Sequence, residues 1–111
     1  MVLDPVPEVG WTPPRLNLLA VAAGGNPAAR ISTDWARYQT RNATAIQLLH
    51  AVQTPGLRHS LPQALLCNTT IPGRCMVQAN GQLYYADDDH LSMLGARRVV
   101  DDMMLQASTQ P

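Results

Sequence analysis

The stretch LYYADDDHLSMLGARRVVDDMM, residues Leu83–Met104, decides how the C-terminal part of this chain folds. Ser92 is a residue type that caps helix N-termini. Apolar residues follow it at the spacing of one helix face, at Ala96, Val100, Met103, Met104 and Ala107. The pattern predicts a helix beginning after Ser92, with these positions on one face. His90 therefore lies where a loop enters a helix.

Within this stretch, Asp87 and His90 have the spacing of an acid–base pair. On a tight loop, the carboxylate can accept a hydrogen bond from the imidazole Nδ1–H, which leaves Nε2 free as a base. Three consecutive acids repel one another, so we expect Asp87 alone to face His90, with Asp88 and Asp89 turned to solvent or to a helix N-terminus.

Two other readings of the acidic run remain open. The three aspartates are also typical of a solvated approach to a helix cap. A calcium loop is the other reading, but calcium needs further oxygen ligands at alternating positions and a glycine turn, which the following HLSML does not supply.

A predicted hairpin delivers the chain to this loop. Residues Met76–Ala79 and Gln82–Tyr85 flank Asn80-Gly81, the strongest short-range hairpin signal. Just before it, Cys67 and Cys75 enclose NTTIPGR, which contains turn-forming residues. A disulfide between them would stabilise the fold by roughly 2.5 kcal/mol. Two reduced thiols are the alternative.

Upstream, the sequence predicts several short elements. Met1–Leu3 has the character of the tail of a buried parallel strand, or of a frayed terminus. The remaining predicted elements are a helix from Arg15 to about Ala23 with Pro14 at its start, a helix from about Thr33 to Val52 capped by Ser32 or Thr33, a short strand at Leu57–Leu61, and a helical turn from Pro62 to Leu66.

No metal or cofactor motif stands out. His50 lies beside the apolar stripe of the second helix and is expected at its surface or boundary, while His59 alternates outward with polar residues and is expected to be exposed. Neither has a partner at a recognisable metal-ligand spacing. Two cysteines alone cannot make a zinc site. The prediction is therefore no metal and no cofactor.

Composition excludes several function classes. The 111 residues carry zero formal net charge, so no basic patch exists to neutralise the phosphates of a nucleic acid. The longest apolar run, Leu18–Ala23, is far too short to span a membrane. No signal peptide is visible, because Met1 is soon followed by Asp4 and Pro5 without a basic region.

The final block resembles a known family. Asp87-x-x-His90, followed by Leu91-Ser92 and then Gly95-Ala96, is similar to the last block of SGNH hydrolases and acyltransferases, and YYADDDHLSMLGA resembles the SGNH domain that bacterial O-antigen-acetylase-like proteins carry after a membrane acyltransferase domain. The resemblance implies that residues 1–111 form the C-terminal half of a three-layer, flavodoxin-like α/β domain. It also implies that Asp87 and His90 belong to a Ser-His-Asp triad.

The family's nucleophile block, Gly-Asp-Ser, and its oxyanion-hole glycine and asparagine blocks are absent from this sequence. None of the four serines follows an apolar strand as a nucleophile elbow requires. The resemblance therefore implies a partner, either the missing N-terminal half or a membrane acyltransferase domain. It also implies a glycan or acyl-ester substrate and a periplasmic or other extracytoplasmic location. An inactive remnant or a small interaction module is the alternative.

Overall fold

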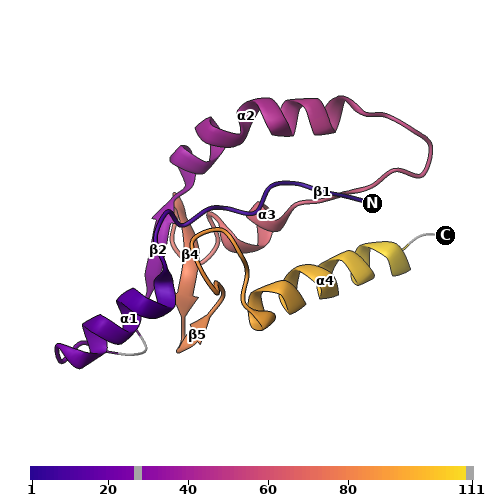
Figure 1. The fold of residues 1–111 in the computed structure, drawn as a ribbon. Helices are drawn as coiled ribbons and strands as arrows, with labels where there is room; N and C mark the ends of the chain where they lie inside the picture. Colours follow the sequence, from indigo (N-terminus) through magenta and orange to yellow (C-terminus); the bar gives the residue numbers. More distant parts are fainter. Residues whose placement is uncertain (27–28, 110–111) are drawn as a thin grey trace.

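The computed structural model describes residues 1–26 and 29–109, which fold as a mixed α/β domain with short sheets (Figure 1). The strands are β1 (Val2–Leu3), β2 (Ile31–Asp34), β3 (His59–Ser60), β4 (Arg74–Ala79) and β5 (Gln82–Leu83). The helices are α1 (Pro13–Ala22), α2 (Trp35–Ala51), α3 (Pro62–Leu66) and α4 (Met93–Ser108). The α/β class predicted from the sequence is thus confirmed.

The strands form one parallel pair and one antiparallel sheet. β1 pairs with β3 in parallel, with Val2 opposite His59 and Leu3 opposite Ser60. The second sheet has the order β2-β4-β5 and is antiparallel. The parallel strand predicted at Met1–Leu3 is confirmed, but its predicted burial is not, because Leu3 is exposed.

The parallel pair lies between α2 and α4 (Figure 1). On one side, His50 of α2 contacts Asp4, which follows β1 directly. On the other side, the Arg58 guanidinium beside β3 donates to the Gln106 carbonyl of α4. One contact from each helix therefore reaches the two-stranded pair, whereas the larger sheet is antiparallel, with α2, β3 and α3 inserted between β2 and β4.

The core forms around β4, which is buried at Cys75–Ala79. The predicted hairpin is confirmed: Asn80 and Gly81 have φ values of 53° and 72°, the positive values that a type I′ turn requires at both positions. Tyr38, Leu66, Tyr84 and Tyr85 pack into the same cluster. Buried tyrosines need partners for their hydroxyls, and Tyr85 donates to the Pro7 carbonyl at 2.6 Å.

The second helix begins later than predicted. Ser32 and Thr33 lie in β2, and the N-cap of α2 is Asp34, whose carboxylate accepts from the Arg37 N–H at 3.0 Å. The predicted cap is therefore wrong. Pairing of β2 with β4 extends the backbone of these residues, so the helix cannot begin until Trp35.

α4 buries residues outside the apolar set named from the sequence. Ser92 caps it as expected, accepting from the Gly95 N–H at 3.1 Å. Its buried residues are Gly95 and Val99, while Val100 and Met104 are more than half exposed. The side of α4 that carries Val100 and Met104 is therefore largely exposed.

The molecule is elongated, measuring 53 × 29 × 23 Å. Its radius of gyration is 15.4 Å, against about 13 Å for a compact domain of this length. Its accessible surface is 6989 Å², against about 6000 Å² for a monomer of this mass. Large apolar side chains contribute to that surface, among them Leu18, Leu19, Leu48, Met104 and Leu105. Among the described residues, no helix has both the length and the apolar character needed to cross a membrane.

Candidate functional site

The loop carrying Asp87 and His90 is closed at its base by backbone pairing. The Ala86 N–H donates to the His90 carbonyl at 2.8 Å, and Tyr85 and Leu91 form an antiparallel bridge. These contacts fold residues 86–90 into a tight loop. The tight loop expected from the Asp-x-x-His spacing is therefore present.

The structure brings Asp87 and His90 together. The Asp87 carboxylate oxygens lie 2.9 and 3.0 Å from His90 Nδ1. Asp87 Oδ1 also accepts from the backbone N–H groups of Asp89 and His90, at 3.1 and 2.7 Å. The His90 side chain is 74% exposed, so its ring is accessible to a substrate or a partner. With Nδ1 facing the carboxylate, Nε2 is the nitrogen available for proton transfer.

The electrostatics of the loop favour a charged Asp87 beside His90. The two backbone hydrogen bonds, aided by His90 itself, lower the pKa of Asp87 to about 2. The hydrogen bond to Asp87 and the charges of Asp87 and Asp89 raise the pKa of His90. The pair is therefore an anionic acid holding an imidazole of increased basicity.

Asp89 also approaches His90, which the sequence analysis did not anticipate. Its Oδ1 lies 2.8 Å from the same Nδ1. Desolvation and a hydrogen bond with Asp87 raise the pKa of Asp89. The expectation that Asp87 alone faces His90 is therefore wrong, although the opposite pKa shifts leave Asp87 as the more acidic partner.

The N-terminal segment braces this loop from a distant part of the chain. The Val9 N–H donates to the Asp88 carbonyl at 2.7 Å, and the Tyr85 hydroxyl donates to the Pro7 carbonyl. The proline-rich segment after β1 therefore lies directly against the Asp87–His90 loop.

The start of α4 fixes the other side of the loop. Ser92 Oγ donates to the Leu83 carbonyl at 2.8 Å, and the Ser92 N–H donates to the Tyr84 carbonyl at 2.9 Å. A Cβ built on Gly95 would lie 2.2 Å from the Tyr84 oxygen, so only glycine permits this approach. The Ser92 and Gly95 positions of the HLSMLGA block thus seat the helix that follows His90.

A pocket of about 300 Å³ lies beside the braced segment. Its lining residues include Trp11, three arginines and two acids, namely Arg37, Arg41, Arg74, Glu8 and Asp34. Glu8 pairs with Arg41 at 2.7 Å across exposed surface. The pocket lining therefore combines an aromatic residue with residues of both charges, and it includes Val9, whose N–H bonds to Asp88.

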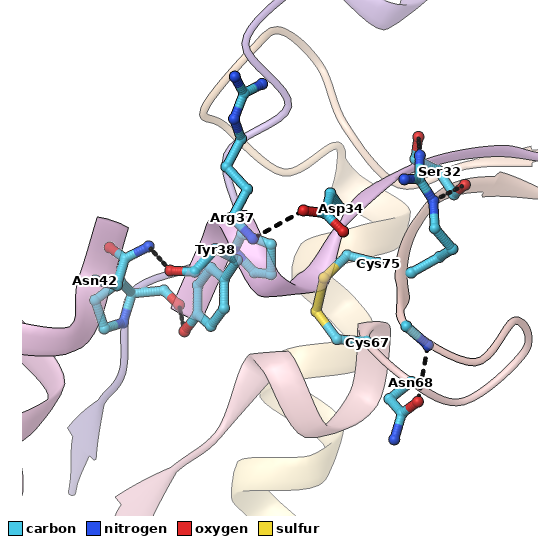
Figure 2. The surroundings of a disulfide bond; sticks show 12 residues. Ser32, Asp34, Arg37, Tyr38, Asn42, Cys67, Asn68 and Cys75 are labelled. Atoms are coloured by element: carbon cyan, nitrogen blue, oxygen red, sulfur yellow. Dashed lines mark hydrogen bonds between the residues drawn. A yellow bond between two sulfur atoms is a disulfide. The ribbon is translucent and has the colours of Figure 1, made fainter. Parts of the chain in front are cut away.

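The predicted disulfide is present, and it lies near this pocket. Cys67 and Cys75 are joined and buried (Figure 2). In Figure 2 the pocket-lining residues Arg37, Tyr38 and Asn42 extend from α2 on one side of the disulfide. The disulfide ties the chain after α3 to β4.

No serine hydroxyl in residues 1–26 and 29–109 hydrogen-bonds a histidine ring. Ser32 Oγ accepts from Arg74, Ser92 Oγ makes the helix-cap contacts, and Ser108 Oγ donates to the Leu105 carbonyl. Ser60 is completely buried, and among the described residues its hydroxyl has no hydrogen-bond partner. Each serine hydroxyl thus either hydrogen-bonds a backbone carbonyl or an arginine, or is buried away from solvent.

A second group of titratable residues forms at Asp4, His50 and His59, and sequence reasoning missed it. His50 Nε2 lies 2.9 and 3.0 Å from the two Asp4 oxygens, and His59 Nδ1 lies 3.9 Å from Oδ1. The expectation that His59 is exposed is wrong, because its side chain is only 21% exposed and faces Asp4. No spacing signal marks this group, since Asp4 and His50 are 46 positions apart.

Comparison with known proteins places the chain in a family. A family model described as "SGNH domain (fused to AT3 domains)" matches residues 1–104 and so includes the Asp87–His90 loop and most of α4. Searches of curated proteins and of solved structures returned no match. The match covers nearly the whole chain, and the chain therefore belongs to the family of SGNH domains that are fused to AT3 acyltransferase domains.

Proposed function

We propose that this chain supplies the acid–base part of an SGNH acyl-transfer site, with His90 as the base and Asp87 as its orienting acid. The observation that carries the proposal is the contact of both Asp87 oxygens with His90 Nδ1. The Asp-x-x-His block that makes this contact lies inside the region matched by the family model.

In the proposed reaction, a serine Oγ attacks the carbonyl carbon of an acyl ester while His90 Nε2 takes the serine proton. The imidazolium then returns that proton to the departing alcohol. In the second half, a glycan hydroxyl or a water attacks the acyl carbon of the acyl-serine and loses its proton to His90, which then gives that proton to serine Oγ as the acyl–Oγ bond breaks. Asp87 remains ionised throughout and stabilises the imidazolium, which its lowered pKa supports.

We propose that the nucleophilic serine and the oxyanion donors come from residues outside this 111-residue sequence, either an N-terminal half of the domain or a fused acyltransferase domain. Two observations support this. The four serines are bonded elsewhere or buried. The elongated shape and the exposed leucines are the features expected of a unit that packs against more protein.

The proposal that part of the site lies outside this sequence also suggests how the β1–β3 pair fits into a larger sheet. The parallel β1–β3 pair between α2 and α4 is what part of a three-layer, flavodoxin-like sheet would look like. We propose that residues 1–111 are the C-terminal part of such a domain. The disulfide favours an extracytoplasmic setting, where bacterial surface glycans would be the acyl acceptors.

The test is reconstitution. The chain would be fused to, or mixed with, an SGNH N-terminal segment that carries Gly-Asp-Ser, and turnover of a small acetyl ester would be measured. The chain alone should be inactive and the reconstituted pair active. His90→Ala should abolish that activity, and Asp87→Asn should reduce it by up to about 10⁴-fold.

Asp88→Asn is the matched control, because the contact of Asp88 with Val9 uses its backbone carbonyl. It should keep near-normal rates. Full activity of the His90→Ala pair would refute the role of His90. An inactive pair whose two parts bind each other would favour the alternative reading, an interaction module without catalysis.

A further inference from the structure

The Asp4 carboxylate is buried, and a buried negative charge is stable only beside a positive charge or a hydrogen-bond donor. Asp4 is 1% exposed, and its side chain is fully buried. A buried carboxylate is costly unless it is paired or bound to a cation. The side chains that surround it are two imidazoles, from His50 and His59, and the amide of Gln63, whose Nε2 donates to Oδ2 at 2.9 Å.

Two polar atoms in this group have no hydrogen-bond partner among the described residues. They are His59 Nδ1 and Gln63 Oε1, both shielded from solvent. The 3.9 Å separation of His59 Nδ1 from Asp4 Oδ1 is too long for a hydrogen bond. The contacts within the chain therefore leave a buried ring nitrogen unsatisfied beside a buried anion.

The distances between the ligand atoms of Asp4, His50 and His59 are compatible with one small cation bound by all three residues. Tetrahedral Zn²⁺ with bonds of about 2.0–2.1 Å places its ligand atoms about 3.3 Å apart. His50 Nε2 and His59 Nδ1 lie 3.0 and 3.9 Å from the same carboxylate oxygen, Asp4 Oδ1, on either side of that value. The ligand atoms of all three residues lie within 4.8 Å of one another.

We propose that Asp4 Oδ, His50 Nε2 and His59 Nδ1 form a binding site for a first-row divalent metal ion, with Zn²⁺ the best match. Two imidazoles and one carboxylate are a donor set typical of zinc and unlike that of calcium or magnesium. Gln63 positions the Asp4 carboxylate through its amide N–H. The His50 side chain is 42% exposed and gives the ion a route from solvent.

The placement of the ligands gives the ion a structural role. Asp4 follows β1, His50 lies in the last turn of α2, and His59 lies in β3. A bound ion would link the end of α2 to the parallel pair. Tyr38 is the single residue of α2 that is buried, so this link would add substantially to the helix's attachment.

The experiment uses the whole 111-residue chain, prepared without a histidine tag and freed of metal by chelation. Zn²⁺ binding would be measured by competition with a chromophoric chelator. We expect one ion per chain. His50→Gln and His59→Gln should weaken binding more than about 100-fold, while Gln63→Ala should weaken it about 10- to 100-fold, the range typical of residues that orient a ligand.

The matched control is the other cluster of potential ligands, Asp87, Asp89 and His90, which is exposed. His90→Gln should leave Zn²⁺ affinity unchanged. If His90→Gln abolishes binding and His50→Gln does not, the ion binds at that loop and the proposal is wrong. Absence of stoichiometric binding to the unmodified chain would likewise overturn it and leave a plain Asp–His ion pair.

A second measurement avoids the risk that a variant fails to fold. In the unmodified chain, Zn²⁺ should shift the imidazole NMR resonances of His50 and His59 and leave those of His90 in place. It should also raise the midpoint of thermal unfolding. Shifts confined to His90 would contradict the proposal.

Discussion

The closest approach between α4 and the hairpin makes Gly95→Ala a sharp test of how the site is held. Helix propensity alone predicts that this substitution stabilises the protein by about 1 kcal/mol, because Gly95 lies inside α4. The structure predicts the opposite sign. The new Cβ would lie 2.2 Å from the Tyr84 carbonyl oxygen and 3.1 Å from Leu91 Cδ2.

The loss of folding stability in Gly95→Ala can be estimated from the contacts that the new methyl group would displace. An ordinary contact at this position is 3.4–4 Å, so α4 must move by more than about 1 Å from a backbone atom that cannot yield cheaply. Such overpacking costs about 1–3 kcal/mol. The movement also strains the 2.9 Å bond from the Ser92 N–H to Tyr84, worth about 1 kcal/mol. After the propensity gain, a net loss of about 2 kcal/mol is expected.

Thermal unfolding followed by circular dichroism would measure it, with an expected drop in the midpoint of about 8–12 °C. Ala96→Gly, in the same turn, gives the propensity effect alone and should cost about 1 kcal/mol. A Gly95→Ala protein as stable as the unmodified chain, or more so, would refute the close packing of α4 on the hairpin.

Three further predictions follow from single contacts. NMR titration should give His90 a pKa above 6.5, and Asp87→Asn should lower it, because the hydrogen bond to Asp87 is the largest cause of the raised pKa. Because the folded state favours the imidazolium of His90, the stabilisation from the Asp87–His90 pair is complete below pH 6.5 and is lost as pH rises through the folded pKa. In the reconstituted enzyme, turnover should rise over the same pH range, because His90 must be neutral to act as a base. Mass spectrometry should find Cys67 and Cys75 joined after periplasmic expression, and reduction should cost roughly 2.5 kcal/mol in denaturant melts. Tyr85→Phe should cost about 1–3 kcal/mol by leaving a backbone carbonyl without its 2.6 Å donor, and an unchanged melting curve would exclude that bond.

The features that the sequence determined by itself are those made by near neighbours in the chain. Asp87 reaches His90 across three positions, and Ser92 caps α4 through a residue three positions on. The turn at Asn80-Gly81 needs positive φ at both positions, which those residue types tolerate. Such contacts close within one turn or loop, so the residue types and their spacing are enough to predict them.

Tertiary structure decided the features that depend on residues far apart. Ser32 and Thr33 suit a helix cap but became strand because β4, more than 40 positions away, pairs with them. Val99 and not Val100 is buried on α4, because the hairpin and β3 determine which side of that helix is covered.

The group at Asp4 is the clearest case. The parallel pairing of β1 with β3 places His59 beside Asp4, and α2 brings His50 to the same carboxylate. The spacing of these residues carries no signal, because the pairing of distant strands and the packing of a helix create the group. The local pattern thus predicted the Asp87–His90 pair, whereas only the folded chain could assemble Asp4, His50 and His59.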